Sequence, residues 1–521
     1  MFAPSVFAFL PLPHWPPMCC PFRSVSRLVC LVAVGLLLPA GCSMTPEMAP
    51  PDAQKALPEQ FASAPGDTTL PATATDTTAY DASRWWTTFE DSALVALVDT
   101  ALAANLDLDV AQARLEEVAA QFRIARAPLF PRINADGQAS TQRQPSNVGI
   151  SGVIGGEQAP DRFSYETYQA SLGLSYELDF WGRLRSQRKA ALGQYFATAA
   201  DLQAARLSVI SQTILTYAEI AFLQQQVRLE TQRVDLLEKR LAITEARYMR
   251  GLASSFELHT LRQSLQAAQT DRPDVERRLY DAESRLATLL GRFAGEQQAL
   301  LPDSIALATS LARAPDPVPA GLPSDLLMQR PDVRAAAHRL EATRQEIGVA
   351  RADRLPNLSL TAQGGVQSAA LADLVGPGQQ FSTIMAQITA PLFQGGRLRA
   401  NLSAAEARYK QQAARYEQTL LTAFREVKAA LVAYDKQRQR DRTVRQQVQA
   451  AHDAVQTQRH RYERGIGNVL SLLDAERTLV QARIRWARVR QAVVNARVAL
   501  HRALGGSWTK TPAPEDPRLL K

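Results

Sequence analysis

The chain has 521 residues, with 59 Lys plus Arg against 51 Asp plus Glu and a formal net charge of +8. Both signs are interspersed along the chain, which indicates a solvated surface and excludes a concentrated nucleic-acid interface. The six histidines fall at no metal-ligand spacing, and the chain has no phosphate-binding glycine loop, HExxH or GxSxG motif. We therefore expect no enzyme, no catalytic residue, no metal and no cofactor beyond a covalent lipid.

The first predicted element is an export signal over residues 1–41, for which Met18 is a better start than Met1. Arg23 and Arg27 precede an apolar run that ends at Leu38, too short for a spanning helix of about 20 residues. The signal closes on AGC, which resembles the lipobox of bacterial lipoproteins and implies lipidation, including palmitate, at Cys42. Pro39 departs from that pattern, so ordinary cleavage with a passive Cys42 is the alternative.

Residues 42–84 are rich in Pro, Ala, Thr and Asp, which predicts a lipid-anchored linker. Two copies of one unit follow, at 85–291 and 326–508, joined by a connection at 292–325 and followed by a tail at 509–521. GRLR at 182 recurs at 396, and RY at 247 recurs at 461, both at an offset of 214. Earlier in each copy the offset is 225, pairing residues 114–131 with 339–356. A tandem duplication explains both alignments.

Each copy contains two segments in which apolar and polar residues alternate, and these predict strands. The four strands are expected at about 133–143, 166–178, 357–367 and 381–392. Strands of about ten residues with one apolar face suit a transmembrane barrel, although an ordinary half-buried hairpin has the same pattern. Four strands cannot close a barrel, which needs about eight, and open edges are not viable in lipid. The chain is therefore expected to oligomerise.

The remainder of each copy is predicted to be helical. Residues 94–127 and 326–353 precede the strands, and long helices follow at 183–248 with 252–291, and at 397–462 with 466–505. Apolar residues from Leu420 to Tyr434 step by 4, 3, 4 and 3, which is typical of helices supercoiled side by side. Gly251 and Gly465 should reverse the chain, and Pro273 should kink or interrupt the helix that contains it.

A series of motifs in chain order resembles one known family. They are WWTTFED at 85, ARAPLFPRI at 125, YELDFWGRLR at 176, RYMRG at 247, LLMQRPDV at 326, PLFQGGRLRAN at 391, RYERG at 461 and ALGGSW at 503. Together they resemble the TolC-like outer-membrane factors, in particular the NodT-type lipoprotein branch of multidrug efflux.

The resemblance implies a mixed fold, all-α plus transmembrane β. A homotrimer would form a 12-stranded barrel, four strands per chain, continued by a long periplasmic α-helical barrel. It also implies a lipid-anchored protein of the bacterial outer membrane, in contact with its lipids. The implied partners are a periplasmic adaptor and an inner-membrane transporter of RND, MFS or ABC type.

The resemblance further assigns two sets of site residues. Adaptor contact falls on the hairpin tips, with helix capping as the alternative role: Arg247, Tyr248, Gly251, Ser254, Ser255, Arg461, Tyr462 and Gly465. A periplasmic gate falls on Leu470, Asp474 and Arg477, spaced for one helix face. A ring of three Asp474 carboxylates would favour cations, whereas an ordinary surface pair with Arg477 is the alternative.

The expected function is therefore a passive exit duct for drugs or other small molecules in a tripartite efflux system. A duct for type I protein secretion shares this fold and is one alternative. A periplasmic coiled-coil scaffold lipoprotein without a pore is another. The exported substrate cannot be identified from the sequence.

Overall fold

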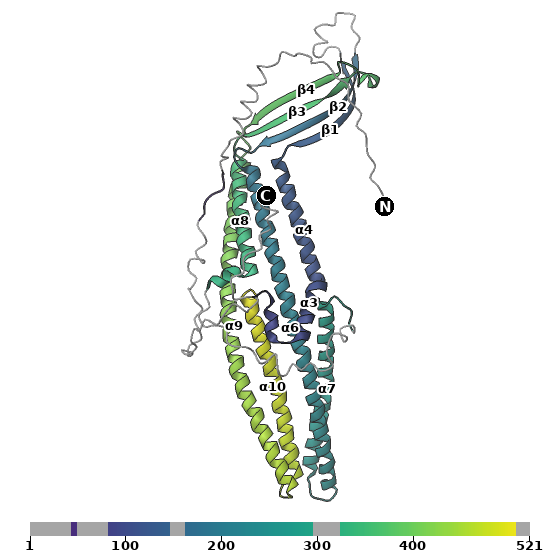
Figure 1. Ribbon diagram of the computed structural model, residues 1–521, viewed down its shortest axis with the longest axis vertical. Helices are drawn as coiled ribbons and strands as arrows, with labels where there is room; N and C mark the ends of the chain where they lie inside the picture. Colours follow the sequence, from purple (N-terminus) through teal and green to yellow (C-terminus); the bar gives the residue numbers. More distant parts are fainter. Residues whose placement is uncertain (1–42, 49–81, 146–161, 295–323, 507–521) are drawn as a thin grey trace, which may run out of the picture.

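A computed structural model describes residues 43–48, 82–145, 162–294 and 324–506. The predicted signal, Cys42, most of the linker and connection, and the tail lie outside these residues. Figure 1 shows an elongated molecule with a sheet at one end and helices running away from it. None of the described helices is both long enough and apolar enough to cross a membrane.

The sheet contains four antiparallel strands in the order β1-β2-β3-β4. They are β1 (Arg132–Pro145), β2 (Arg162–Leu178), β3 (Asn357–Ser368) and β4 (Gln380–Thr389). β2 begins four residues before the start predicted for it, and β4 ends three residues before its predicted end. β2 and β3 belong to different copies, so strand pairing joins the two copies.

The register of the sheet separates an apolar face from a polar one. One row across all four strands consists of Ile133, Leu174, Ala362 and Ile384. The neighbouring row consists of Asn134, Gly173, Gln363 and Thr383. Since side chains alternate between faces along each strand, most of the apolar side chains lie on one side, whereas Phe381 and Met385 of β4 lie on the other. In a single chain this side is open, and Ile384 is 79% exposed.

Two very long helices form the axis of the molecule. α6 (Arg183–Tyr248) has 66 residues and α9 (Arg397–Glu463) has 67, so each spans about 100 Å. α4 (Leu106–Arg126) and α8 (Pro331–Ala352) flank their upper halves. α7 (Ser255–Leu289) and α10 (Val469–Ala503) flank their lower halves (Figure 1). α7 continues through Pro273, so of the two predicted outcomes the interruption is absent and the kink stays a prediction. Pro273 lies on an exposed turn, where water can satisfy the carbonyl that loses its partner.

The helix predicted at 94–127 is two helices, α3 (Ser92–Ala104) and α4, separated at Asn105. The Asn105 side chain caps α4 by accepting from the amides of Asp107 and Leu108. Its Nδ2 also donates to Leu289 O, 3.0 Å away at the end of α7. In the second copy Arg330 takes this place and donates from Nη1 to Ala503 O at 2.8 Å. Both pairs keep the offsets of 225 and 214, so the two copies bind their return helices in the same way with different side chains.

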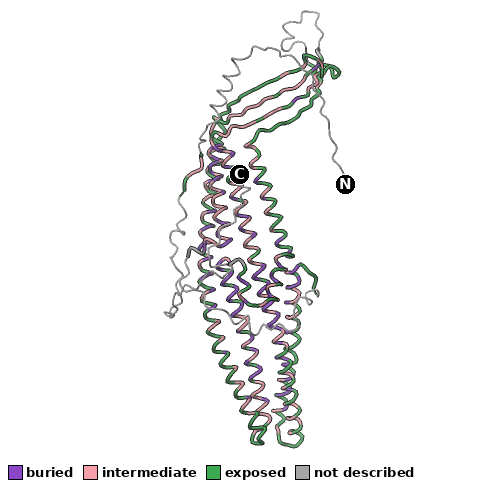
Figure 2. The backbone as a smooth tube through the Cα atoms, in the orientation of Figure 1, coloured by how far each residue is buried: buried purple, intermediate pink, exposed green. Residues whose placement is uncertain are grey.

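The core is concentrated at mid-height, as Figure 2 shows in purple. There η2 (Ala82–Phe89) and α3 pack Trp85, Phe89 and Leu94 against Ile214 and Tyr217 of α6. The second copy has its own cluster around Leu420, Val427 and Leu500. Below this level α6 also packs against α10 through Leu229, Val480 and Ile484. α6 therefore contacts both return helices, one from each copy.

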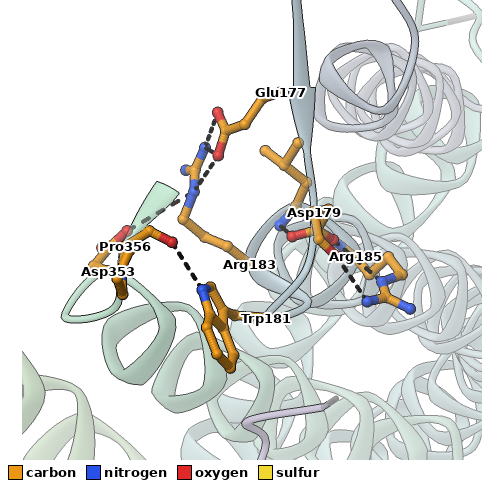
Figure 3. Close-up of polar contacts among 8 residues, drawn as sticks. Glu177, Asp179, Trp181, Arg183, Arg185, Asp353 and Pro356 are labelled. Atoms are coloured by element: carbon orange, nitrogen blue, oxygen red, sulfur yellow. Dashed lines mark hydrogen bonds and ion pairs between the residues drawn. The ribbon is translucent and has the colours of Figure 1, made fainter. Parts of the chain in front are cut away.

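The contact between sheet and helices is polar (Figure 3). Arg183 donates to Glu177 at 2.8 Å, and Asp179 caps α6 by accepting from the amides of Leu184 and Arg185. Trp181 Nε1 donates to Pro356 O at 2.8 Å, which joins the start of α6 to the turn before β3. The direction of α6 relative to the sheet is thus fixed by charged and aromatic groups.

Candidate functional site

The lower ends of the helices are two hairpin tips with the same backbone. Gly251 and Gly465 both have a φ of +72°, a conformation that favours glycine. Leu252 N donates to Arg247 O at 2.8 Å, and Ile466 N donates to Arg461 O at 3.0 Å. These are equivalent helix-ending bonds at an offset of 214.

The helices that return from the tips also begin in the same way. Ser254 Oγ accepts from Glu257 N at 3.1 Å, and Asn468 Oδ1 accepts from Leu470 N at 3.0 Å. α7 and α10 therefore begin three residues later than predicted, because a capping residue precedes each of them. Arg247 donates to Leu252 O at 3.3 Å, which gives it the capping role foreseen for the tip arginines.

Apolar side chains are exposed at the tips. In the first copy Met249 is 83% exposed and Phe256 is 79% exposed, and in the second copy Ile466 is 68% exposed. Tyr248 and Tyr462 are also exposed. Exposed apolar groups at the end of a long rigid rod are typical of an interaction site.

The residues predicted to form the gate lie on α10, just above its tip. Asp474 Oδ1 accepts from Arg477 Nη2 of the same helix at 3.0 Å and from Arg240 Nη1 of α6 at 3.0 Å. Leu470 is one turn nearer the tip and half-buried. Asp474 is thus not a free carboxylate: two guanidinium groups and one carboxylate give this cluster a net charge of +1 (2 − 1). Within one chain this is the pair with Arg477 given above as the alternative, extended by Arg240, and the ring of three carboxylates stays a prediction.

The sequence did not reveal Arg240. It lies 234 residues from Asp474, and its equivalent in the second copy is Ala454, so neither a local motif nor the repeat marks it. Only the packing of α6 against α10 brings the two together. Conversely, the first-copy equivalents of the gate residues, Phe256, Thr260 and Gln263, are all exposed.

A second difference between the copies lies at the level of the gate residues. Arg262 on α7 donates to Glu245 on α6 at 2.8 Å. At the equivalent positions Arg459 on α9 donates to Glu476 on α10 at 3.3 Å. The two ion pairs occupy equivalent positions in the two copies, but the acidic and the basic residue are exchanged between the helices. Within the described residues, no group of three or more His, Cys, Asp or Glu side chains could hold a metal.

The proteins that this chain resembles belong to one family of outer membrane efflux proteins. The family model described as outer membrane efflux protein matches residues 97–292 and 322–506. The chain is 32% identical to the probable efflux pump outer membrane protein TtgC of Pseudomonas putida, over 92% of this chain and 95% of that protein. It is 34% identical to the outer membrane protein OprJ of Pseudomonas aeruginosa, over 82% of this chain and 87% of that protein.

Solved structures give the same result. The outer membrane channel CmeC of Campylobacter jejuni matches with a TM-score of 0.77 at 25% identity, covering 90% of this chain and 96% of that one. The open state of the MtrE outer membrane channel of Neisseria gonorrhoeae matches with a TM-score of 0.72 at 28% identity, covering 89% and 98%. These relatives are channel and efflux proteins.

Proposed function

The chain belongs to the outer membrane efflux protein family, and from this membership we propose that three copies form the exit duct of a tripartite pump. The protein is the outer-membrane channel component of an efflux system, with its helices extending into the periplasm. The proposal concerns its assembly, its partners, its gate and its lipid.

The observation that carries the proposal is the open sheet. β1 and β4 lie at the edges of the described sheet, and one face of it is apolar. Four strands cannot enclose a lumen, whereas three chains supply twelve, enough for a closed barrel in lipid. The helices of the three chains would then continue the barrel as a tube.

We assign adaptor binding to the hairpin tips. Their exposed apolar residues and their rigid, duplicated backbone support this assignment, with Arg247, Tyr248, Ser254, Ser255, Arg461 and Tyr462 around the two glycines. The type of inner-membrane transporter is not distinguished by these features. Energy must come from that transporter, since the channel supplies only a path.

We assign gating to the cluster of Arg240, Asp474 and Arg477, with Leu470 beside it. Within the described residues Arg477 Nε is buried without a hydrogen-bond acceptor. Its Nη2 donates to Asp474, so the described contacts hold the guanidinium at one end.

The cargo is proposed to be small organic molecules. Relatives from Pseudomonas putida are described as components of antibiotic, toluene and solvent efflux pumps. Cys42 is proposed to carry the lipid that anchors the mature chain in the outer membrane.

Reconstitution of the full-length protein tests the duct. Outer-membrane preparations should contain a trimer that dissociates on heating in detergent, and planar bilayers should show discrete channels. A strain lacking the gene should become more susceptible to toxic organic compounds and recover with the intact gene. Purified protein that forms neither trimers nor channels would favour the scaffold alternative, and loss of a secreted protein without altered susceptibility would favour type I secretion.

A further inference from the structure

Residues 43–48 are separated from the rest of the described chain, yet they lie against the upper helices beside α8 (Figure 1). Thr45 Oγ1 donates to Gln345 Oε1 of α8 at 3.0 Å and lies 3.3 Å from Ser186 Oγ of α6. Arg344 Nη1 donates to Pro46 O at 2.9 Å. These residues are therefore held by the fold, although their composition predicts a free linker.

The groups that receive this segment are preorganised. Ser186 and Gln345 are 3% and 4% exposed. Gln345 Nε2 donates to Glu341 Oε1 at 2.7 Å, which orients its oxygen toward Thr45. Glu341 also accepts two hydrogen bonds from Arg344 at 2.8 Å, so the guanidinium is fixed where it meets Pro46. Burial opposes the charge of Glu341, but the bonds from Arg344 and Gln345 outweigh it and lower its pKa.

A glycine makes room for Thr45. A Cβ on Gly348 would lie 2.5 Å from Thr45 Oγ1 and 3.2 Å from Thr45 Cα. Gly348 lies inside the 22-residue helix α8 and lacks a positive φ, so the backbone does not require glycine there. Glycine inside a helix costs about 1 kcal/mol relative to alanine. Position 348 must lack a side chain because the docked segment occupies the space, and because an added Cβ would also lie 3.1 Å from Ser186 Oγ.

We propose that Ser186, Arg344, Gln345 and Gly348 form a docking groove for the peptide that follows Cys42, and that this groove holds the lipid anchor at the rim of the barrel. The anchoring role rests on the proposed acylation of Cys42, whereas the docking itself does not. Thr45 is three positions after Cys42, so covalent geometry confines the Cα of Cys42 to within about 11 Å of the Cα of Thr45.

The position of the groove suits that role. Ser186 lies in the first turn of α6, which begins at Arg183, five residues after the end of β2. The groove is therefore just below the sheet, at the level where a barrel leaves the membrane. Because Ser186 belongs to the first copy and Gln345 to the second, the docked peptide also bridges the two copies. Load on the lipid is thereby transmitted to the paired helices and not to an edge strand.

A disulfide in the full-length protein tests the docking. The substitutions Thr45→Cys and Ser186→Cys place two thiols where two hydroxyl oxygens lie 3.3 Å apart. Apart from Cys42, the chain has cysteines only at 19, 20 and 30, in the predicted signal. Mild oxidation of outer-membrane vesicles should give the cross-linked peptide in nearly all chains, as measured by mass spectrometry.

Adding Gly348→Ala should slow cross-linking at least tenfold, although alanine strengthens the helix itself. The matched control is Thr343→Val, an α8 substitution at a residue whose hydroxyl bonds only to Leu340 O among the described contacts. Heat-sensitive trimers confirm folding in every variant. Slow cross-linking in the parent pair, or equal rates in the Gly348 and Thr343 variants, would overturn the docking.

The mass of the N-terminal peptide reports acylation separately. Acylated Cys42 with rapid cross-linking supports both parts of the proposal. An unmodified Cys42 with rapid cross-linking would overturn the anchoring role and the proposed lipidation, while the docking groove would stand.

Discussion

Removing the Arg240 guanidinium should make the channel easier to open. Of the two ion pairs of Asp474, the one with Arg477 lies within α10, whereas the one with Arg240 joins α10 to α6. Movement of the α10 tip away from α6 would break only the pair with Arg240. Arg240→Ala is therefore the substitution that isolates the contribution of this contact to the closed state.

The size of the effect follows from exposure. The Asp474 side chain is 50% exposed and that of Arg240 is 25% exposed, so solvent screens the pair. Pairs of this kind contribute up to about 1 kcal/mol. One such pair changes a two-state equilibrium about fivefold, and three opening together in a trimer change it up to about 150-fold. The effect should shrink in high salt, which screens exposed charges.

Single-channel recording in planar bilayers measures this directly, as the fraction of time spent in the larger conductance. The matched control is Arg277→Ala, because both of its partners, Asp274 at 3.0 Å and Asp281 at 2.8 Å, lie with it on α7. The double substitution Asp474→Ala with Arg477→Ala should raise conductance as well. If Arg240→Ala and Arg277→Ala have the same open fraction as the unaltered protein, the cluster does not hold the channel closed.

Three further results are expected. Gly251→Ala should cost about 1 kcal/mol at its positive φ and speed amide exchange at the tip about fivefold, unlike Gly137→Ala, whose backbone has no such φ. Glu245→Arg should lower the temperature of trimer dissociation, because it places two guanidinium groups beside each other. Adding Arg262→Glu should restore that temperature. If it does not, the ion pair does not stabilise the hairpin. Burial and nearby Arg497 hold the pKa of His501 well below 6.5, so an unfolded chain takes up a proton that the folded chain refuses. Stability should therefore fall as pH drops below about 6.5, by up to about 1.4 kcal/mol per unit, and His501→Gln should flatten this slope in thermal unfolding between pH 5 and 7.

Much of the fold could be predicted because it depends on periodicity. Strands with a row such as Ile133, Leu174, Ala362 and Ile384 must alternate in sequence, and helices packed along 100 Å must repeat their apolar residues. The break at Asn105 was missed because an asparagine inside an apolar helical pattern resembles any polar surface position. Of its two roles, capping α4 is local, whereas binding the end of α7 exists only after α7 has folded back.

The site was predictable only in part, for the same reason. Duplication marked the tips, since Gly251 and Gly465 need the same backbone in both copies. Arg240 and the docking groove have no such marker, because their partners are more than 100 residues away and belong to the other copy or to the N-terminal segment. Composition alone assigned residues 43–48 to a linker, although Thr45 and Pro46 form hydrogen bonds with α8.

The reversed ion pairs disfavour an exchange of partners between the two nearly equal hairpins. If α6 paired with α10 at the register it uses for α7, Glu245 would face Glu476. If α9 paired with α7 in the same way, Arg459 would face Arg262. Each wrong pairing thus sets like charges together, while each native pairing sets opposite charges together. α6 does contact α10, but through Leu229, Val480 and Ile484 and the pair of Arg240 with Asp474, a register without an equivalent in the other copy. The duplication therefore supplies the common frame, and the charges that differ between copies distinguish the native helix pairings from the exchanged ones.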